Sequence, residues 1–216
     1  GSSIPVGQLE QLIHMFPTVG FVQTYGQTEA SPRITALLPC DCLKKLGSVG
    51  KPIPQVRVRI EREDGTQAKP NQIGEIVVQG PNVMKGYYKR EDITKQTIVN
   101  GWLHTGDLGY IDLDGYYYLT GRKKNMIISG GINLYPEEIE EILLQHPDIE
   151  EACVFAEPDA ILNEVPAAKI KVSDRGIDIH ALHEYCSQRL ASYKVPTQFY
   201  IVEELPKTYN GKLKRY

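Results

Sequence analysis

The sequence predicts an α+β protein, with a β-rich, distorted-barrel-like module followed by a smaller domain of mixed helices and strands. Two observations predict this class. From Gly50 to Leu119 short apolar runs alternate with turns, whereas after Arg122 helical and strand periodicities alternate. The 216 residues suffice for one large domain or two small ones. We expect the division at Arg122, which gives domains 1–122 and 123–216.

The first module is expected to begin with a helix and a buried strand. Apolar residues recur at helical spacing from Leu9 to Phe16, and Pro17 ends that run. The run Val19–Tyr25 is predicted to be a buried strand that opens into a polar loop. Further strands are expected at Val56–Ile60, Glu75–Gln79, Leu108–Asp112 and Tyr116–Leu119, with hairpin turns at Asp64-Gly65 and Asp114-Gly115.

The second domain begins with a predicted helix. Pro136 suits a first helical turn, the acidic residues after it complement the helix dipole, and Pro147 ends the helix. Asp178 is expected to cap another helix. That helix should turn Ile179, Leu182, Cys186 and Leu190 inward. Strands are expected at Ala152–Ala156, Ala167–Val172 and Gln198–Val202.

Composition excludes several classes of protein. The formal net charge of −3 gives no global attraction to nucleic acid or anionic lipid. No apolar run approaches the roughly 20 residues that span a bilayer, and the first residues lack the regions of a signal peptide. The cysteines, at Cys40, Cys42, Cys153 and Cys186, follow neither a disulfide framework nor a zinc pattern. We therefore expect a soluble, cytoplasmic protein with reduced thiols.

The segment Thr24-Tyr25-Gly26-Gln27-Thr28-Glu29 carries the parts of a nucleotide site. Its glycine permits close backbone approach, threonine hydroxyls can donate to phosphate, and Tyr25 offers a ring face. Glu29 can bind magnesium through oxygen. The alternative is a strand end followed by an ordinary turn.

Asp107 and the segment after Gly121 offer charged groups. Asp107 follows a glycine at a strand start and can accept two hydrogen bonds from the vicinal hydroxyls of a ribose, although it can also cap its own backbone. The basic run Arg122-Lys123-Lys124 lies at the domain boundary, where a few residues can absorb a hinge rotation. The alternatives are a solvated linker there and a simple turn at Gly130-Gly131.

Near the end of the sequence, Asn210-Gly211 predicts a tight turn that would present Lys212 at a loop tip. A flexible ammonium group there can reach into a neighbouring domain and neutralise carboxylate and phosphate charge. The alternative is a solvated basic tail.

Taken together and in this order, these four segments resemble those of the adenylate-forming superfamily, which includes acyl-CoA ligases, luciferases and the adenylation domains of peptide synthetases. The resemblance runs from Gly1-Ser2-Ser3-Ile4-Pro5, similar to the family's small-residue strand beside the acyl and adenine pocket, through to Lys212. It implies that residues 1–122 are the carboxyl-terminal part of a large adenylation domain and 123–216 a small mobile lid.

The resemblance implies a role for each matching residue. Ser3 and Thr24 would line the nucleotide site, Tyr25 would stack on adenine, and Gly26 and Gln27 would line the acyl-phosphate region. Thr28 would contact phosphate, and Glu29 would coordinate magnesium. The ribose would be bound by Asp107 and Arg122.

For the lid, the resemblance implies a hinge at Lys124 and a loop at Gly130-Gly131 beside a thiol tunnel. Lys212 would bridge the acyl carboxylate and the α-phosphate during adenylation. The implied ligands are ATP, AMP, magnesium and either coenzyme A or phosphopantetheine. The implied substrate is a small carboxylic acid.

The family's Ser/Thr/Gly-rich phosphate loop has no counterpart in this sequence. The chain is therefore expected to need an amino-terminal half as partner and to be inactive alone. The leading hypothesis is an AMP-forming acyl-CoA ligase. An adenylation domain that loads a carrier protein and a non-catalytic docking module remain alternatives.

Two other groups of residues are interpreted as structural and not as binding sites. His180 and His183 lie one helical turn apart without a third metal ligand nearby, which favours a surface pair. The tyrosine runs Tyr87-Tyr88 and Tyr116-Tyr117-Tyr118 favour packing and edge burial over stacking on bases. No nucleic-acid partner and no membrane span are expected.

Overall fold

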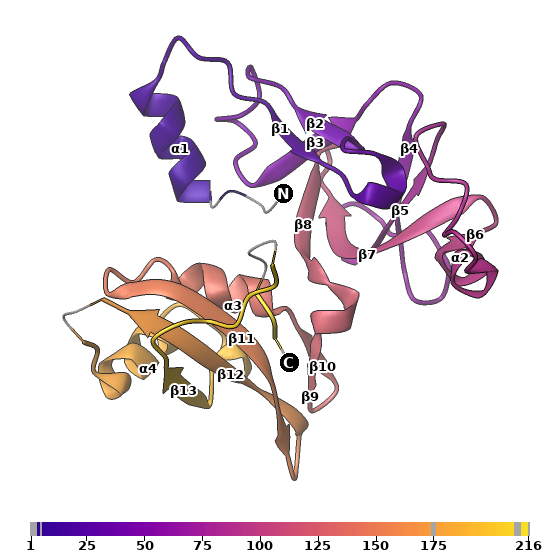
Figure 1. Ribbon diagram of the computed structural model, residues 1–216. Helices are drawn as coiled ribbons and strands as arrows, with labels where there is room; N and C mark the ends of the chain where they lie inside the picture. The colour runs from indigo at the N-terminus through magenta and orange to yellow at the C-terminus, as the bar shows by residue number, and fades with distance from the viewer. Residues whose placement is uncertain (1–3, 5, 174–175, 210–212, 216) are drawn as a thin grey trace. The chain divides into compact units, whose positions relative to one another are not determined.

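The structure is a computed structural model that describes residues 4, 6–173, 176–209 and 213–215. These residues form two compact units, divided in the sequence between Lys123 and Lys124 (Figure 1). Each unit contains its own β-sheet and its own apolar core. The predicted α+β class is confirmed. The interpretation of the units as the end of an adenylation domain and a mobile lid stays a prediction.

The first unit is built on one antiparallel sheet with the strand order β1-β2-β3-β8-β7-β5-β4, and β6 pairs with β7. The strands are β1 (Gln23–Tyr25), β2 (Thr35–Leu37), β3 (Ser48–Pro52), β4 (Arg57–Glu61), β5 (Gly74–Gln79), β6 (Ile98–Val99), β7 (Trp102–Ile111) and β8 (Tyr117–Arg122). The predicted turn at Asp114-Gly115 joins β7 to β8, with Gly115 at a φ of 84°. Asp64-Gly65 closes a smaller turn in which the Arg62 amide donates to the Thr66 carbonyl, at 2.9 Å.

The predicted strand Val19–Tyr25 is wrong over its first half. Only Gln23–Tyr25 form a strand, and Val19 and Val22 are each 53% exposed. The reason is tertiary: β1 pairs with β2, which is three residues long, so there is no partner strand opposite the residues before Gln23. The first helix, α1 (Val6–Met15), begins three residues earlier than predicted. The short helix α2 (Glu91–Thr97) has no buried residue, and the apolar pattern gave no signal for it.

Gly50 in β3 offers a test of this packing. Its φ is 88°, and an added Cβ would lie 2.0 Å from the carbonyl carbon of Ala36 in β2. Gly50→Ala should therefore add about 1–3 kcal/mol of overpacking to the roughly 1–2 kcal/mol that a positive φ costs. Urea unfolding followed by Trp102 fluorescence measures this, because the one tryptophan of the chain lies in the first unit.

Gly65→Ala is the matched control, since Gly65 has a φ of 78° but no heavy atom within 4 Å of an added Cβ. Gly65→Ala should lower the free energy of unfolding only by the cost of a positive φ, without the overpacking. Equal destabilisation by the two substitutions would show that close contact between β2 and β3 does not limit residue 50.

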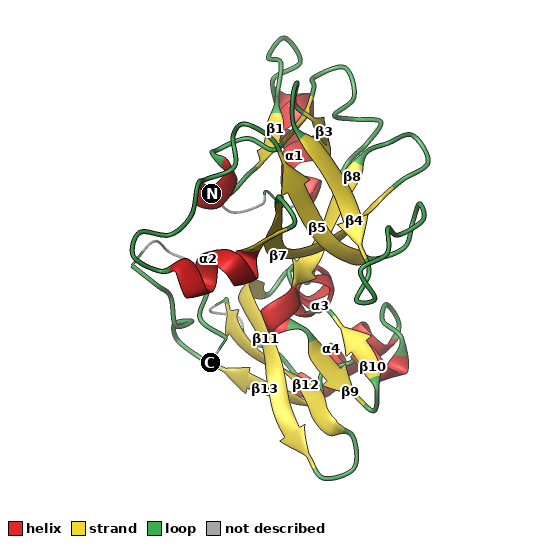
Figure 2. Ribbon diagram, turned by 90° about the vertical axis from the view of Figure 1, so that its right-hand side faces the viewer, coloured by secondary structure: helices red, strands yellow, loops and turns green. Residues whose placement is uncertain are grey.

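The second unit packs two helices against a five-stranded sheet (Figure 2). The order β10-β9-β12-β11 is antiparallel, and β13 pairs with β12 in parallel. The elements are β9 (Ile127–Ser129), β10 (Ile132–Leu134), α3 (Pro136–Leu143), β11 (Ile149–Asp159), β12 (Asn163–Val172), α4 (Ile179–Ser187) and β13 (Gln198–Ile201).

Local signals in the second unit are confirmed. Pro136 begins α3, and the Asp178 carboxylate accepts a hydrogen bond from the His180 amide at 2.8 Å, which caps α4. Leu182 and Cys186 are fully buried, whereas Ile179 and Leu190 are only half-buried. The core joins both helices to the sheet through Ile127, Leu134, Ile139, Leu143, Val154, Ile170 and Leu182.

The remaining expectations concern cysteines, histidines, tyrosines and membrane spans. The four cysteines are free thiols, and His180 and His183 are both exposed on α4, as expected of a surface pair. Tyr117 is buried, as predicted, but the predicted burial of Tyr88 is wrong because that side chain is 86% exposed. None of the helices in the described part of the chain combines the length and apolar character needed to cross a membrane.

Candidate functional site

The centre of the candidate site is a hydrogen-bonded group of three residues from three strands of the first unit. The hydroxyl of Tyr25, at the end of β1, donates to Asp107 Oδ2 at 2.7 Å. Asp107 Oδ1 lies 2.7 Å from Arg122 Nε, because the antiparallel register of β7 and β8 sets these two residues opposite each other. The Asp107 amide donates to Thr105 Oγ1, whose hydroxyl donates to the Ile76 carbonyl. Asp107 is thereby fixed from three directions.

Burial determines the electrostatics of this group. The Asp107 side chain is 8% exposed, while that of Arg122 is 44% exposed. Burial, and then the charge of Asp107, raise the pKa of Tyr25 far above its ordinary value, so its hydroxyl remains a proton donor. A carboxylate has about four lone-pair sites, which is more than the hydrogen bonds from Tyr25 and Arg122 occupy. It can accept further hydrogen bonds from a sugar diol beside the exposed guanidinium.

The predicted residues Tyr25, Asp107 and Arg122 are thus brought together, but Tyr25 lies differently from the expectation. Its ring is only 7% exposed and belongs to the core of the first unit, with its hydroxyl directed at Asp107. Stacking of Tyr25 on adenine stays a prediction. The structure adds a contact with Asp107 that local sequence reasoning did not find, because the two residues are 82 positions apart.

The loop after Tyr25 is held by backbone packing. A Cβ at Gly26 would lie 2.4 Å from the Pro32 carbonyl group, so the close approach that requires glycine here is to the protein itself. Asn82 Nδ2 donates to the Ala30 carbonyl at 2.7 Å, and the Met84 amide donates to the Glu29 carbonyl at 2.7 Å. Thr24 and Thr28 are exposed and Gln27 half-buried, so their polar groups can meet a ligand. Ser3 lies outside the described residues.

Glu29 is the candidate magnesium ligand. Its Oε1 accepts a hydrogen bond from the Tyr87 hydroxyl at 2.8 Å, a contact across 58 positions that the sequence did not reveal. The described residues contain no group of three or more His, Cys, Asp or Glu side chains placed to hold a metal. A single carboxylate fits magnesium, because this ion commonly takes one or two protein carboxylates and completes its shell with water and substrate phosphates.

A second charged group, centred on Glu75, lies on the same sheet. Glu75 in β5 accepts from the Gly106 amide at 3.0 Å, and its Oε2 lies 3.3 Å from His104 Nδ1 and 3.2 Å from Lys123 Nζ. Burial raises the pKa of Glu75, but the Gly106 amide and Lys123 outweigh burial, so that pKa lies below its ordinary value. Glu75 is therefore charged and holds the residue that follows Arg122.

The remaining candidates lie in the second unit. Lys124 is exposed in a short 3-10 helix, Lys123–Asn125, at the division between the units. Gly130 and Gly131 form the exposed turn between β9 and β10, with φ values of 55° and 82°. Lys212, the predicted catalytic residue, lies outside the described residues, although the flanking residues Lys207 and Leu213 form an antiparallel bridge.

Two family models match the chain. Residues 1–88 match the family model of AMP-binding enzymes, and residues 138–212 match the model of the AMP-binding enzyme C-terminal domain. A 2-succinylbenzoate–CoA ligase of Bacillus cereus is 49% identical over 193 residues, which are 89% of this chain and 40% of that protein.

Two solved structures of an o-succinylbenzoate coenzyme A synthetase from Bacillus subtilis are also similar. One contains the acyl-adenylate intermediate and superimposes with a TM-score of 0.94, and the other contains ATP and a magnesium ion and gives 0.92. Each is 40% identical to this chain and covers all of it, while the chain covers 44% of the solved chain.

The likeness of its two-sheet α+β structure to the synthetase from Bacillus subtilis places the chain in the structural class of the adenylate-forming enzymes. The chain belongs to the AMP-binding enzyme family of that superfamily. It spans 40% of the length of the curated relative described above.

Proposed function

We propose that this chain is part of an AMP-forming acid–thiol ligase, which activates a carboxylic acid as acyl-AMP and transfers the acyl group to coenzyme A. The observation that carries the proposal is the Tyr25-Asp107-Arg122 group, a buried carboxylate with an exposed guanidinium beside it. The relatives' names support a coenzyme A ligase. Because those names specify 2-succinylbenzoate, that aromatic dicarboxylate is the first acid to test.

In the first half-reaction a carboxylate oxygen attacks the α-phosphorus of ATP, and pyrophosphate leaves. Asp107 and Arg122 would hold the ribose. Gly26 and Gln27 would line the acyl-phosphate region, and Thr28 would contact phosphate. Lys212 would stand between the two anions, where a positive charge stabilises the developing transition state. Magnesium, bound through Glu29, would neutralise phosphate charge when present.

In the second half-reaction a thiol sulfur attacks the acyl carbon, and AMP leaves. A rotation at Lys124 would withdraw Lys212 and bring up the Gly130-Gly131 turn as the wall of a thiol path. Lys124, Gly130 and Gly131 are all exposed, which supports this proposal. The alternative is the same chemistry with the phosphopantetheine of a carrier protein as the acceptor. Assays of acyl transfer to coenzyme A and to a carrier protein distinguish the two. Either reaction would take place in the cytoplasm.

The chain by itself should release no pyrophosphate from ATP with any carboxylic acid, because no phosphate loop is present in its sequence. An enzyme of the relatives' full length that contains this chain should release pyrophosphate with 2-succinylbenzoate. It should then form a thioester when coenzyme A is added. Carboxylate-dependent pyrophosphate exchange by the chain alone would contradict the assignment of its parts. Failure of acyl-AMP to bind the full-length enzyme would favour a docking module.

A further inference from the structure

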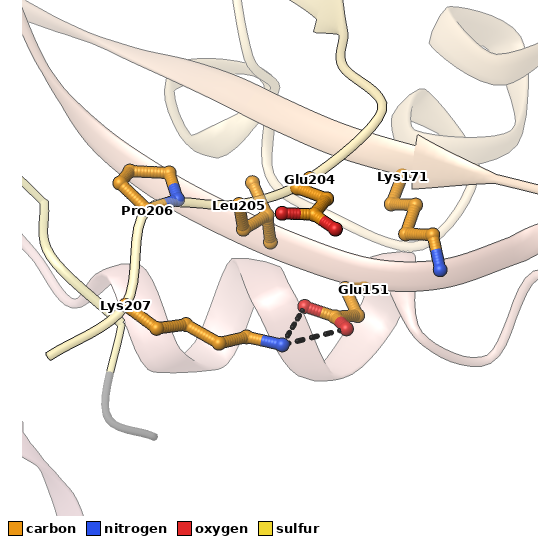
Figure 3. A pocket seen from close by; sticks show the side chains of 6 residues that line it. All are labelled: Glu151, Lys171, Glu204, Leu205, Pro206 and Lys207. Atoms are coloured by element: carbon orange, nitrogen blue, oxygen red, sulfur yellow. Dashed lines mark hydrogen bonds and ion pairs between the residues drawn. The ribbon is translucent and has the colours of Figure 1, made fainter. Parts of the chain in front are cut away.

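A C-terminal strap, defined as the described residues 203–209 and 213–215, is attached to the second unit on both sides of Lys212. On one side Leu205 is buried at 5% exposure, and Lys207 reaches Glu151 of β11 at 2.7 Å (Figure 3). Lys207 pairs with Leu213, and the Lys214 amide donates to the Pro206 carbonyl at 2.8 Å. Residues 206–207 of the strap are therefore paired with residues 213–214.

On the other side Arg215 is held in a buried ionic cluster. One of its terminal nitrogens bonds to Glu140 Oε1, and the other lies 3.0 Å from Glu140 Oε2 and 3.0 Å from Glu137 Oε1. The side chains of Arg215 and Glu140 are 13% and 10% exposed. Glu140 also accepts from the Val154 amide at 2.7 Å, so α3, β11 and the strap share one carboxylate.

The two attachments differ in strength. The Lys207–Glu151 pair is 41% and 32% exposed, and exposed pairs hold side chains weakly. The Arg215 guanidinium donates to both oxygens of a buried carboxylate, a geometry that fixes direction as well as distance. The strap is thus held more strongly at Arg215 than at Lys207.

We propose that Arg215 is a positioning residue that holds Lys212 in register for acyl-adenylate formation. The inference rests on the proposed function. Lys212 precedes Arg215 by three residues, and three residues span at most about 10 Å when fully extended. Fixing Arg215 to Glu140 therefore limits, through the covalent chain alone, how far the lysine can move from that ion pair. Catalysis by a placed charge is sensitive to displacements of about 1 Å.

A merely structural role for Arg215 makes a different prediction. If the cluster only stabilised the second unit, its loss would impair both half-reactions, because the Gly130-Gly131 turn belongs to the same unit. If Arg215 acts through Lys212, only the half-reaction that uses Lys212 should fall. The two half-reactions can be measured separately.

The test uses Arg215→Met in the full-length enzyme. We expect kcat for pyrophosphate release to fall by about 10- to 100-fold, the range that misplacement of a reacting group produces. Thioester formation from preformed acyl-AMP should change less than about twofold. Lys194→Met is the matched control, because Lys194 also pairs with a glutamate of α3, Glu138, at 2.6 Å.

Removal of Arg215 alone leaves Glu140 buried without its partner and can prevent folding. The double variant Glu140→Gln/Arg215→Met removes both charges and retains an acceptor for the Val154 amide. It should keep the wild-type circular dichroism spectrum and show the same selective loss of adenylation. Equal loss in both half-reactions, or no loss in the double variant, would overturn the inference.

A double-mutant cycle adds a second readout. In a Lys212→Ala background Arg215→Met should lower adenylation by less than about twofold, because the residue it positions is already gone. Additive losses would overturn the positioning role. If the wild-type enzyme forms no acyl-AMP, the proposed function fails, whereas an active wild type with additive losses contradicts only the role of Arg215.

Discussion

Lys212→Ala is expected to lower acyl-adenylate formation by about 10²- to 10³-fold, the cost of removing one preorganised electrostatic group from a transition state. The carboxylate and the α-phosphate are both anionic, so the uncatalysed encounter is opposed by charge repulsion that a positive group between them relieves. In thioester formation from preformed acyl-AMP the sulfur attacks the acyl carbon, and no bond forms between a carboxylate and a phosphate. Thioester formation should therefore retain most of its rate.

Pyrophosphate release and single-turnover thioester formation measure these two steps in the full-length enzyme. Lys214→Ala is the control, because Lys214 is an exposed lysine of the same strap. It should leave both rates within about twofold. Equal loss of both half-reactions in Lys212→Ala would refute the proposal that the second unit changes position between them.

Asp107→Ala is expected to weaken nucleotide binding and also to destabilise the first unit. The buried Tyr25 hydroxyl loses its acceptor, which costs about 1–3 kcal/mol of unfolding free energy. Loss of charged hydrogen bonds to a ribose costs about 1.5–3 kcal/mol of binding free energy, which is roughly a 10- to 100-fold rise in Kd. Arg122 is 44% exposed and can be solvated, so it should add little to the destabilisation.

Calorimetric titration with AMP and urea unfolding followed by Trp102 fluorescence measure the two effects. Asp92→Ala is the matched control, since the Asp92–Arg90 pair is also an Asp–Arg pair of the first unit but is 60% and 56% exposed. It should change stability by less than about 1 kcal/mol. Unchanged AMP affinity in Asp107→Ala would exclude this aspartate as the ribose ligand.

Features set by neighbouring residues could be predicted from the sequence. The Asp178 cap, the start of α3 at Pro136 and the turn at Asp114-Gly115 each depend on a few adjacent residues, and all three are found. The predicted start of a strand at Val19 was wrong because the extent of the strand depends on a partner strand elsewhere in the chain. An apolar run alone does not reveal where its partner ends.

The candidate site likewise contains residues that the sequence predicted and long-range contacts that it did not. Asp107 and Arg122 were proposed as a pair through resemblance, and the register of β7 and β8 sets them opposite each other. The bonds from Tyr25 to Asp107 and from Tyr87 to Glu29 join distant positions and have no local signature. Such contacts follow from sheet order, which spacing along the chain does not encode.

The bond between Tyr25 and Asp107 also has a consequence for the order of folding. Asp107 and Arg122 face each other across a single hairpin, whereas Tyr25 must close a loop of 82 positions to reach Asp107. Closing that loop costs about 4 kcal/mol of chain entropy by the logarithmic loop-closure relation. During synthesis Tyr25 emerges long before its acceptor exists. The candidate site is therefore expected to be among the last parts of the first unit to form, after the β7–β8 hairpin has set Asp107 in place.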